Sequence, residues 1–366
     1  MNVTVIVGGQ FGGEGKGKMT AHLCRTYNFD AVVRCGGPNS GHTITIDNKS
    51  IVLRQIPAGV VNADTKLFLA AGCLIDVNVL LEEIKFFNLT PDRLKIDRNA
   101  IIIDKGDIEN EKNMKLKDRI GSTCTGVGSA VIKRILRKKE TKLAKDLTDL
   151  APYIAEVSHE VNQLVDKGKR IIIEGTQGFG LSIYHSPYYP YTTSRDTTAS
   201  GFLSEVGLGP LVVSDVIMVI RTFPIRVGGN SGPLPKEVDW KTIQIESGYP
   251  YEIREFTTVT NRPRRVGRFD LGIVKKAVIA NRPTSIALMG VDYLDYKNKG
   301  AKSYYNLTEE TKVFISHLEK ELGVGIKFIG TGARDYEIID LLQNSGVIQG
   351  IEGGMENGRL IKISLS

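Results

Sequence analysis

Glycines and lysines near the start of the chain have the types and the spacing that a phosphate-binding loop requires. The stretch VTVIVGGQFGGEGKGKMT (Val3–Thr20) opens with an apolar, β-branched run, which predicts a buried strand over Val3–Val7. Six glycines follow between Gly8 and Gly17, and a helical pattern begins near Met19. Glycines let backbone N–H groups approach a ligand closely, and a helix N-terminus adds partial positive charge. This order of strand, glycine loop, lysines and helix predicts a cradle for phosphate.

The loop matches the known phosphate motifs only in part. The spacing Gly12-x4-Gly17-Lys18 fits a P-loop up to its last position, where Met19 replaces Ser or Thr. The dinucleotide fingerprint G-x-G-x-x-G is absent. Taken alone, the loop therefore leaves a second interpretation open, an ordinary glycine-rich turn between a strand and a helix.

Composition is that of a soluble globular protein. Of the 366 residues, 41% are hydrophobic and 24% are charged, and no apolar run is long enough to span a membrane. The net charge of +7 suits an anionic ligand. The basic run RILRKKETK (134–142) lacks interleaved aromatics and fits a solvated helix end better than a nucleic-acid site. We expect neither a membrane nor a nucleic acid as a partner.

The cysteines indicate a reducing compartment. They lie far apart, without the spacing of a metal site, at Cys24, Cys35, Cys73 and Cys124. We therefore expect reduced thiols and no signal peptide before the first strand. The expected location is the cytoplasm.

Apolar runs alternate with amphipathic stretches along the chain, which predicts an α/β fold with a mostly parallel central sheet and flanking helices. Beyond the first strand and helix we expect strands over 31–34, 66–70, 101–104, 171–173, 216–220, 285–289 and 326–329, a hairpin over 43–55, helices over 77–87, 150–166 and 271–280, and a polar surface segment over 105–117. Residues 1–366 are expected to form a single domain with loop and small subdomain excursions. Ligands of such sheets bind beyond the carboxyl ends of the strands, where the glycine-rich loops fall.

Eight motifs resemble those of adenylosuccinate synthetases, in the order that this family has. They are QFGGEGKGK (10–18), GGPNSGHT (36–43), GSTCTGVG (121–128), EGTQG (174–178), YPYTTSRDTTASG (189–201), RVGGNSGPLP (226–235), TTVTNRPRRVGRFD (257–270) and GTGARD (330–335). The resemblance covers nearly the whole chain. It implies the fold of that family, with a P-loop-like glycine loop after the first strand.

The resemblance also implies a reaction. That family joins aspartate to a 6-oxopurine nucleotide in two steps. A nucleoside triphosphate, with Mg²⁺ bridging its phosphate oxygens, first phosphorylates O6 of the purine, and the aspartate amine then displaces phosphate from C6. Such chemistry depends on positioning and on charge neutralisation. The expected partners are therefore small-molecule nucleotides and aspartate.

Residues in the matching motifs take roles by the same resemblance. The catalytic set would be Lys16, His42 and Gln177, with His42 as a general acid poised near neutral pH. The carbonyl of Gly41 would bind the metal. The nucleotide-binding set would be Gly12, Gly15, Lys16, Gly17, Gly41, His42, Thr43, Arg264, Asp292, Gly330 and Gly332. The substrate-binding set would be Gly13, Asn39, Thr123, Arg137, Gln177, Thr193, Thr260 and Arg262.

Three kinds of contact are implied within the substrate-binding set. The polar side chains Asn39, Thr123, Gln177 and Thr193 would hold the nucleotide monophosphate and its base. Arg262 would clamp the carboxylates of aspartate, with help from Arg264, although Pro263 replaces an arginine of the family there. Arg137 would reach the monophosphate bound by a neighbouring subunit, which implies a homodimer.

Gly13 departs from the family, whose loop reads GDEGKGK and whose aspartate takes the N1 proton from the purine. Three interpretations follow: an inactive nucleotide-binding protein, an ordinary adenylosuccinate synthetase acting on IMP through another base, or a pocket remodelled for guanine. We favour guanine, because the missing side chain would open space beside N1 and C2, where guanine carries an amino group. A branch of the family in bacterial viruses lacks this aspartate, and the chain resembles that branch. Its members convert dGMP, aspartate and a triphosphate to 2-amino-2'-deoxy-N6-succinyladenylate, the precursor of 2-aminoadenine in viral DNA. If the source is a virus, the expected cytoplasm is that of a bacterial host.

A second departure lies where the family reads the base of the triphosphate with a TKLD motif. The corresponding residues here are Leu288-Met289-Gly290-Val291-Asp292, so Asp292 remains while Gly290 replaces the lysine. The sequence therefore predicts ATP as the phosphate donor, with GTP or dATP as alternatives. Asp292 has a second interpretation, as a residue that merely caps the end of a strand.

Overall fold

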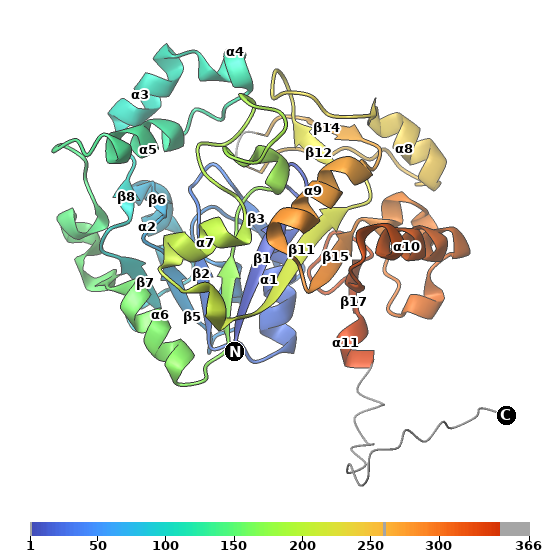
Figure 1. The fold of residues 1–366 in the computed structure, drawn as a ribbon, viewed down its shortest axis with the longest axis horizontal. Coiled ribbons are helices and arrows are strands. Elements are labelled where there is room, and N and C mark those ends of the chain that lie inside the picture. Colours follow the sequence, from blue (N-terminus) through green and yellow to red (C-terminus); the bar gives the residue numbers. More distant parts are fainter. Residues whose placement is uncertain (1, 259–260, 345–366) are drawn as a thin grey trace, which may run out of the picture.

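A ten-stranded sheet runs through the middle of the protein (Figure 1). The computed structural model describes residues 2–258 and 261–344, and in this part of the chain the strand order is β17-β16-β15-β11-β1-β10-β2-β5-β7-β9. Neighbouring strands pair in parallel, except that β16 and β17 are antiparallel. The bounds are β1 Val3–Gly8, β2 Ala31–Arg34, β5 Lys66–Leu69, β7 Leu94–Asp97, β9 Ile154–Ala155, β10 Ile171–Glu174, β11 Val213–Arg221, β15 Ser285–Met289, β16 Ile326–Gly330 and β17 Ile338–Asp340. The predicted α/β fold with a mostly parallel sheet is confirmed.

Both faces of the sheet are buried, which explains the continuous apolar runs of its central strands. Successive side chains of a strand point to opposite faces, so Ile6 packs with Met19 and Leu23 of α1, while Val5 and Val7 face the other cluster. Among the described residues, that second cluster takes side chains from helices on the opposite face as well as from the sheet. The helices are α1 Lys16–Thr26, and on the other face α6 Val157–Asp166, α7 Ala199–Val206, α9 Leu271–Asn281 and α10 Glu309–Leu322.

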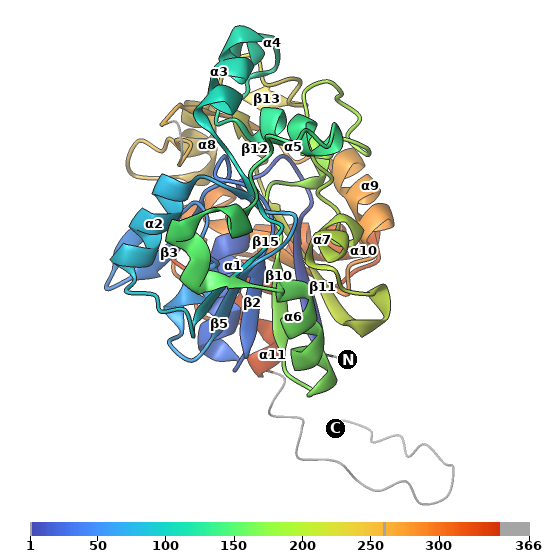
Figure 2. The same cartoon turned by 90° about the vertical axis from the view of Figure 1, so that its left-hand side faces the viewer.

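Smaller elements gather beyond the carboxyl ends of the central strands (Figures 1 and 2). They include the hairpin β3 His42–Ile46 with β4 Lys49–Leu53, the sheet of β12 Ile225–Val227, β14 Arg264–Gly267 and β13 Glu237–Val238, and the helices α3 Lys105–Asn113, α4 Leu116–Ile120, α5 Val127–Ile135 and α8 Trp240–Ser247. The remaining elements are α2 Val77–Phe86, β6 Leu74–Ile75, β8 Ile101–Ile102 and α11 Leu341–Asn344. None of the helices among the described residues is long and apolar enough to cross a membrane.

Several predicted elements are corrected by the structure. Helix α1 begins at Lys16, three residues before the predicted start, because Gly15 takes a left-handed conformation and ends the loop there. The polar segment 105–117 contains α3 and the start of α4, since Asp104 and Asp107 form a reciprocal cap at the start of α3. Only the second half of 150–166 forms an α-helix. The short strands β7, β12, β13, β14 and β17 and the helices α7 and α8 were not among the predicted elements.

Candidate active site

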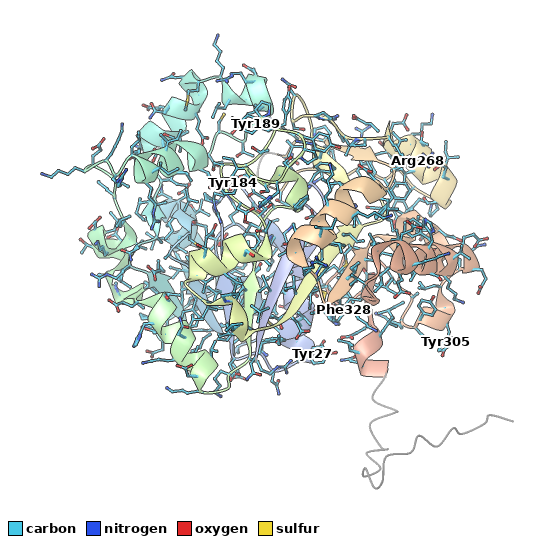
Figure 3. The ribbon with its side chains drawn as sticks, viewed as in Figure 1. Tyr27, Tyr184, Tyr189, Arg268, Tyr305 and Phe328 are labelled. Carbon is cyan, nitrogen blue, oxygen red and sulfur yellow. The ribbon has the colours of Figure 1, made fainter. Side chains whose placement is uncertain are left out.

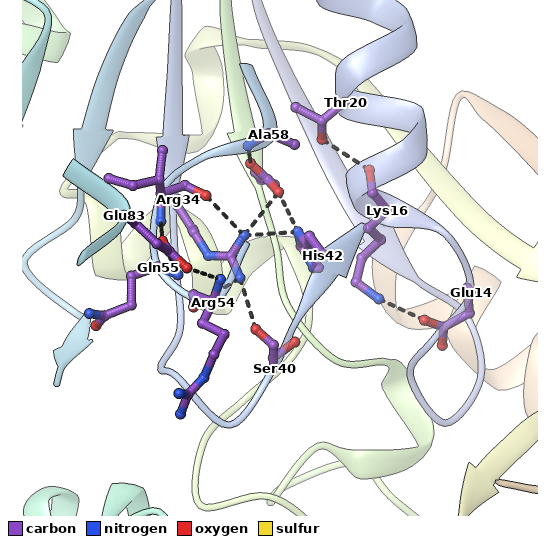
Figure 4. Close-up of polar contacts among 12 residues, drawn as sticks. Glu14, Lys16, Thr20, Arg34, Ser40, His42, Arg54, Gln55, Ala58 and Glu83 are labelled. Carbon is purple, nitrogen blue, oxygen red and sulfur yellow. Dashed lines mark hydrogen bonds and ion pairs between the residues drawn. The ribbon is translucent and has the colours of Figure 1, made fainter. Parts of the chain in front are cut away.

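The phosphate-loop region connects β1 to α1 and contains an internal ion pair. The Lys16 side chain is buried, and its Nζ donates to Glu14 Oε2 at 2.6 Å. The other oxygen of Glu14 accepts from the backbone N–H groups of Gly12, at 2.7 Å, and Gln10, at 3.2 Å. Figure 4 shows the contact of Glu14 with Lys16. Through both sets of contacts Glu14 fixes the shape of the loop and the position of the lysine together.

His42 lies at the start of β3 and packs against α1. A Cβ on Gly17 would lie 2.5 Å from Cβ of His42, so the helix needs a glycine there for the two elements to approach. His42 Nδ1 is hydrogen-bonded to Glu174 Oε1 at the end of β10. Since a carboxylate only accepts, we assign the proton to Nδ1. His42 Nε2 is buried and has no hydrogen-bond partner among the described residues.

Glu174 is held from three sides (Figure 4). Besides His42, it accepts from Arg34 Nη1 at 3.2 Å and from the backbone N–H of Ala58 at 2.7 Å. Burial alone would raise the pKa of Glu174, but these contacts hold it below the usual value. The carboxylate is therefore ionised and fixed in place at neutral pH.

The expectation that His42 titrates near neutral pH is wrong for this structure. Burial and the nearby Arg34 guanidinium lower the pKa of His42 to about 4, although the Glu174 carboxylate acts to raise it. Arg34 Nη1 lies 3.0 Å from Nδ1. At neutral pH the imidazole is therefore uncharged, with a lone pair on Nε2.

A cavity of about 500 Å³ opens beyond the carboxyl ends of the strands, beside the phosphate loop. Its walls come from segments far apart in the sequence, including the loop that carries Tyr189 in Figure 3. The structure brings the following predicted site residues together in this wall: Gly12, Gly13, Asn39, Gly41, Thr123, Gln177, Thr193 and Arg264. The cavity is large enough for a nucleotide-sized ligand.

Two of the predicted residues contact each other in the cavity wall. Gln177, in a left-handed conformation (φ 62°), donates from Nε2 to Thr193 Oγ1 at 2.9 Å. The Thr193 N–H in turn donates to the carbonyl of Leu181 at 2.8 Å. Elsewhere in the lining, Thr123 Oγ1 lies 3.2 Å from Thr125 Oγ1. These side chains present amide and hydroxyl groups at fixed positions.

The space predicted beside Gly13 is occupied. Gly13 has φ 67°, and a Cβ on it would collide with Arg264 Nη1 and lie 2.8 Å from Ile225 Cδ1. The long Arg264 side chain reaches across from β14, so the missing side chain leaves no empty volume in this structure. The expectation of open space at this point is therefore corrected.

A second arginine binds the backbone of Gly13. Arg221, at the end of β11, donates from Nη1 to the Gly13 carbonyl at 3.1 Å. Its guanidinium also forms an ion pair with both carboxylate oxygens of Glu255. Glu255 directly precedes the segment that leads to Arg264, so this pair ties that segment to the phosphate loop.

Another group of predicted residues meets at the ends of β15 and β16. Lys18 is buried, and its Nζ donates to the carbonyls of Gly332 at 2.7 Å and Glu337 at 3.0 Å. Burial lowers the pKa of Lys18 to about 8, although Asp292 acts to raise it. A Cβ on Gly330 would lie 3.1 Å from Lys18 Nζ.

Asp292 in this group accepts a buried hydrogen bond from the hydroxyl of Tyr249. Tyr249 belongs to an aromatic cluster with Tyr293 and Tyr296, and it follows α8. The Asp292 carboxylate is therefore already engaged by a side chain that the sequence did not point to.

Four other predicted positions lie apart from the cavity or outside the described residues. Arg137 is exposed after the end of α5 and does not line the cavity of its own chain. Arg262 donates its backbone N–H to Thr257 Oγ1 at 2.9 Å, which closes the base of the loop between them. Thr260 lies outside the described residues. Thr43 pairs with Val52 in the hairpin.

The structure adds functional candidates that the sequence analysis missed, namely Glu14, Arg34, Glu174, Arg221 and Glu255. Glu14 and Glu174 stand inside the quoted motifs QFGGEGKGK and EGTQG. An acidic residue in a glycine loop and another at the end of a core strand were the available signals. The two arginines and Glu255 gave no comparable signal, since their partners are distant in sequence.

The site can supply a backbone oxygen to a metal. No cluster of three or more His, Cys, Asp or Glu side chains suited to a metal occurs within 2–258 and 261–344. Gly41 lies in the cavity wall, and a side chain there would collide with Thr258 Oγ1. A backbone carbonyl together with phosphate oxygens is a ligand set that Mg²⁺ accepts.

Comparison with known proteins agrees with the motifs. The family model for adenylosuccinate synthetase matches residues 5–149 and 136–299. A protein of Methanocaldococcus jannaschii named adenylosuccinate synthetase is 43% identical over 346 residues, covering 93% of this chain and 97% of that protein. One of Archaeoglobus fulgidus with the same name is 41% identical over 343 residues, covering 93% and 98%.

Two solved structures have a similar fold. A fully ligated adenylosuccinate synthetase of Plasmodium falciparum has a TM-score of 0.82 at 23% identity, covering 93% of this chain and 100% of that one. The succinoaminodeoxyadenylate synthetase of cyanophage S-2L, bound to dGMP and to dATP as an energy donor, has a TM-score of 0.77 at 26% identity, covering 93% and 95%. The family model and the archaeal relatives both span most of the chain. This chain belongs to the adenylosuccinate synthetase family.

Proposed function

We propose that the protein condenses L-aspartate with dGMP at C6, driven by ATP, to give 2-amino-2'-deoxy-N6-succinyladenylate, ADP and phosphate. The observation that carries the choice of guanine is Gly13, because the carboxylate that serves the family as the N1 base is missing there. The cyanophage protein with a similar fold was solved with dGMP and dATP bound, which supports this choice.

The reaction class follows from the family: the chain is a carbon–nitrogen ligase that acts on a purine nucleotide and aspartate. In the first step, O6 of the purine attacks the γ-phosphorus, N1 loses its proton and the nucleoside diphosphate leaves. In the second step, the aspartate amine attacks C6, loses a proton and displaces phosphate. Neither step needs a covalent bond to the protein, so the residues act by position and charge.

Lys16 and the loop N–H groups of Gly12, Gly15 and Gly17 are proposed to bind the transferring phosphoryl group. That group would displace Glu14 from both the lysine and the N–H of Gly12, which the Glu14 carboxylate binds in this structure. Mg²⁺, when bound, neutralises phosphate charge, and the carbonyl of Gly41 is proposed as its protein ligand.

His42 is proposed to act at O6 through Nε2, the ring atom that Glu174 leaves free. The negative charge of the phosphoryl group would raise the pKa of His42 from its low value, so that the ring takes up a second proton and donates it from Nε2. Glu174 would then stabilise the imidazolium through Nδ1. This order makes charging of the histidine depend on the presence of substrate.

The other predicted residues keep their proposed roles. Asn39, Thr123, Gln177 and Thr193 would hold the monophosphate nucleotide in the cavity. Arg262 and Thr260 would bind aspartate, and Thr43 would support the donor phosphates beside His42. Arg137 would enter the cavity of a neighbouring subunit in a homodimer. Asp292, Gly330 and Gly332 would surround the base of the donor nucleotide, together with Lys18.

A second candidate is the ordinary adenylosuccinate synthetase reaction, with IMP, aspartate and GTP. The archaeal relatives carry this name at 38% to 43% identity, and these names favour IMP more than any comparison favours dGMP. The engagement of Asp292 by Tyr249 and the glycine at residue 13 are the features that speak against it.

A substrate panel tests the choice. Purified protein is incubated with aspartate, Mg²⁺, ATP or GTP, and one of dGMP, GMP and IMP, with the Lys16→Ala protein as a matched inactive control. We expect the fastest formation of succinyl nucleotide with dGMP and ATP, measured by chromatography and by release of nucleoside diphosphate. Faster turnover of IMP than of dGMP would establish the second candidate. Binding of nucleotides without turnover would indicate an inactive nucleotide-binding protein.

A further inference from the structure

Arg264 occupies the place where a side chain of residue 13 would begin. A Cβ built on Gly13 would collide with Arg264 Nη1 and lie 3.3 Å from its Cζ. The side chain is anchored by its Nε, which donates to the carbonyl of Phe256 at 3.0 Å, and the Nη1 end of the guanidinium lies against Gly13. Both Gly13 and Arg264 line the cavity. The glycine and the arginine therefore fit together as a pair.

The charges around this pair leave a cationic wall. Arg221 binds the carbonyl of Gly13, so guanidinium groups of two arginines lie at this one residue. The carboxylates nearest to them are already engaged: Glu255 with Arg221 and with the hydroxyl of Tyr293, and Glu14 with Lys16. A ligand at this wall therefore meets hydrogen-bond donors and positive charge.

We propose that Arg264, which the resemblance places among the nucleotide-binding residues, is a substrate-binding residue whose guanidinium faces the N1–O6 edge of the purine in place of the family's carboxylate. This inference rests on the proposal that the cavity holds the purine nucleotide, but not on the choice between dGMP and IMP, which share O6. A guanidinium has five N–H donors and no acceptor. It can donate to O6 but cannot take the N1 proton.

The chemistry at N1 then differs from that of an enzyme with a carboxylate at residue 13. When O6 attacks phosphorus, the N1 proton leaves to water, and the electron pair of the N–H bond stays in the ring, with negative charge shared between N1 and O6. The Arg264 guanidinium stabilises that charge as it develops. A carboxylate added at residue 13 would instead pair with Arg264, and each group would block the other.

A double-substitution cycle tests this pairing. Arg264→Gln is made in the natural background and in Gly13→Asp protein, with Arg268→Gln as the control, because Arg268 is exposed and paired with Glu246 away from the cavity (Figure 3). In the natural background we expect kcat to fall by at least about tenfold. In the Gly13→Asp background we expect the same change to raise kcat, since it frees the new carboxylate to act as a base. Equal losses in both backgrounds would overturn the proposal.

The Gly13→Asp protein alone should turn over dGMP more slowly than the natural protein, and any turnover of IMP should rise once Arg264→Gln is added. Gly13→Asn serves as a neutral isostere, since asparagine also tolerates a positive φ. We expect no gain from Arg264→Gln in the asparagine background. A gain there as large as that with aspartate would show that relief of crowding, and not a freed carboxylate, is responsible, and would contradict the proposal.

Binding measurements do not depend on the folding of any residue-13 variant. Calorimetry compares dGMP with 2-aminopurine deoxyribonucleoside monophosphate, which lacks O6, for the natural, Arg264→Gln and Arg268→Gln proteins. We expect Arg264→Gln to weaken dGMP binding by about fivefold or more while leaving the analogue within about twofold, as loss of one charged hydrogen bond implies. Equal weakening of both ligands would overturn the proposal. If IMP binds and dGMP does not, the choice of guanine fails, and IMP with purine ribonucleoside monophosphate then gives the same test of Arg264.

Discussion

The hydrogen bond between His42 Nδ1 and Glu174 leaves Nε2 of the same ring buried without a partner among the described residues. A buried polar atom without a partner costs free energy, and such atoms in native proteins usually have a functional or solvent partner. Because Arg34 and the N–H of Ala58 also bind Glu174, the ring is held in one orientation. Glu174 therefore holds the His42 ring so that Nε2 has a fixed position and direction.

Substitution of His42 by asparagine should abolish turnover while nucleotide binding stays within about tenfold of the natural protein. The physical reason is that Nε2 acts mainly on charge that develops in the transition state. Turnover is measured by release of nucleoside diphosphate, and binding by calorimetry. His159→Asn is the control, since His159 is exposed on α6. Equal losses in binding and rate would assign His42 a structural role.

Stability should fall as the pH is lowered from 6.5 toward 4, in part because of His42. Its pKa is lowered from 6.5 to about 4 in the folded protein, so within this window the unfolded chain binds a proton that the folded protein does not. Above pH 6.5 His42 binds no proton in either the folded or the unfolded state, so its contribution to the free energy of unfolding is constant. His42→Gln should reduce the slope of the unfolding free energy against pH by up to about 1.4 kcal/mol per pH unit.

Urea unfolding at several pH values across this window measures the slope, with His159→Gln as the control for loss of an exposed imidazole. An unchanged slope in His42→Gln protein would show that His42 is charged in the folded state, paired with Glu174, and that other groups cause the acid sensitivity.

Mixing two inactive variants should restore activity if the site is shared between subunits. Arg137→Leu removes the residue proposed to enter the neighbour's cavity, and Lys16→Ala disables the phosphate loop of its own chain. A mixed dimer would contain one intact site of two, so about half of the activity of a natural dimer is expected per mixed dimer, and about a quarter in an equal mixture that reassociates at random. Failure of the mixture, with mixed dimers shown by mass spectrometry, would place Arg137 outside the neighbour's site.

Removal of the Tyr249 hydroxyl should shift the choice of phosphate donor toward GTP. In Tyr249→Phe protein the ring remains in its aromatic cluster, but Asp292 loses its hydrogen bond and is free to accept from N1–H and the amino group of guanine. The ratio of kcat/KM for GTP to that for ATP should rise by about fivefold or more. Tyr251→Phe is the matched control, since that hydroxyl accepts from Lys299. An equal ratio in both variants would show that Asp292 does not read the donor base.

The sequence by itself determined the fold class and the edge of the sheet at which the glycine motifs meet. Strands such as β1 and β10 are buried on both faces, so they appear as continuous apolar runs that can be read without any partner. Loops that follow such strands meet at one edge of a parallel sheet, which places the glycine motifs together. The polar stretch around α3 was misjudged, because its helix depends on caps and on packing against α5 and shows no apolar periodicity.

The tertiary structure alone decided how the chemical groups are paired. Glu174 and His42 are 132 positions apart in the chain, and their contact restricts rotation of the His42 ring. Burial and Arg34 then lower the pKa of His42. Likewise, Gly13 in the sequence signals a missing carboxylate, but only the structure shows a guanidinium from β14 in its place. Which side chains from different loops come into contact depends on how those loops fold. The local sequence does not give the distance between side chains that are far apart in the chain.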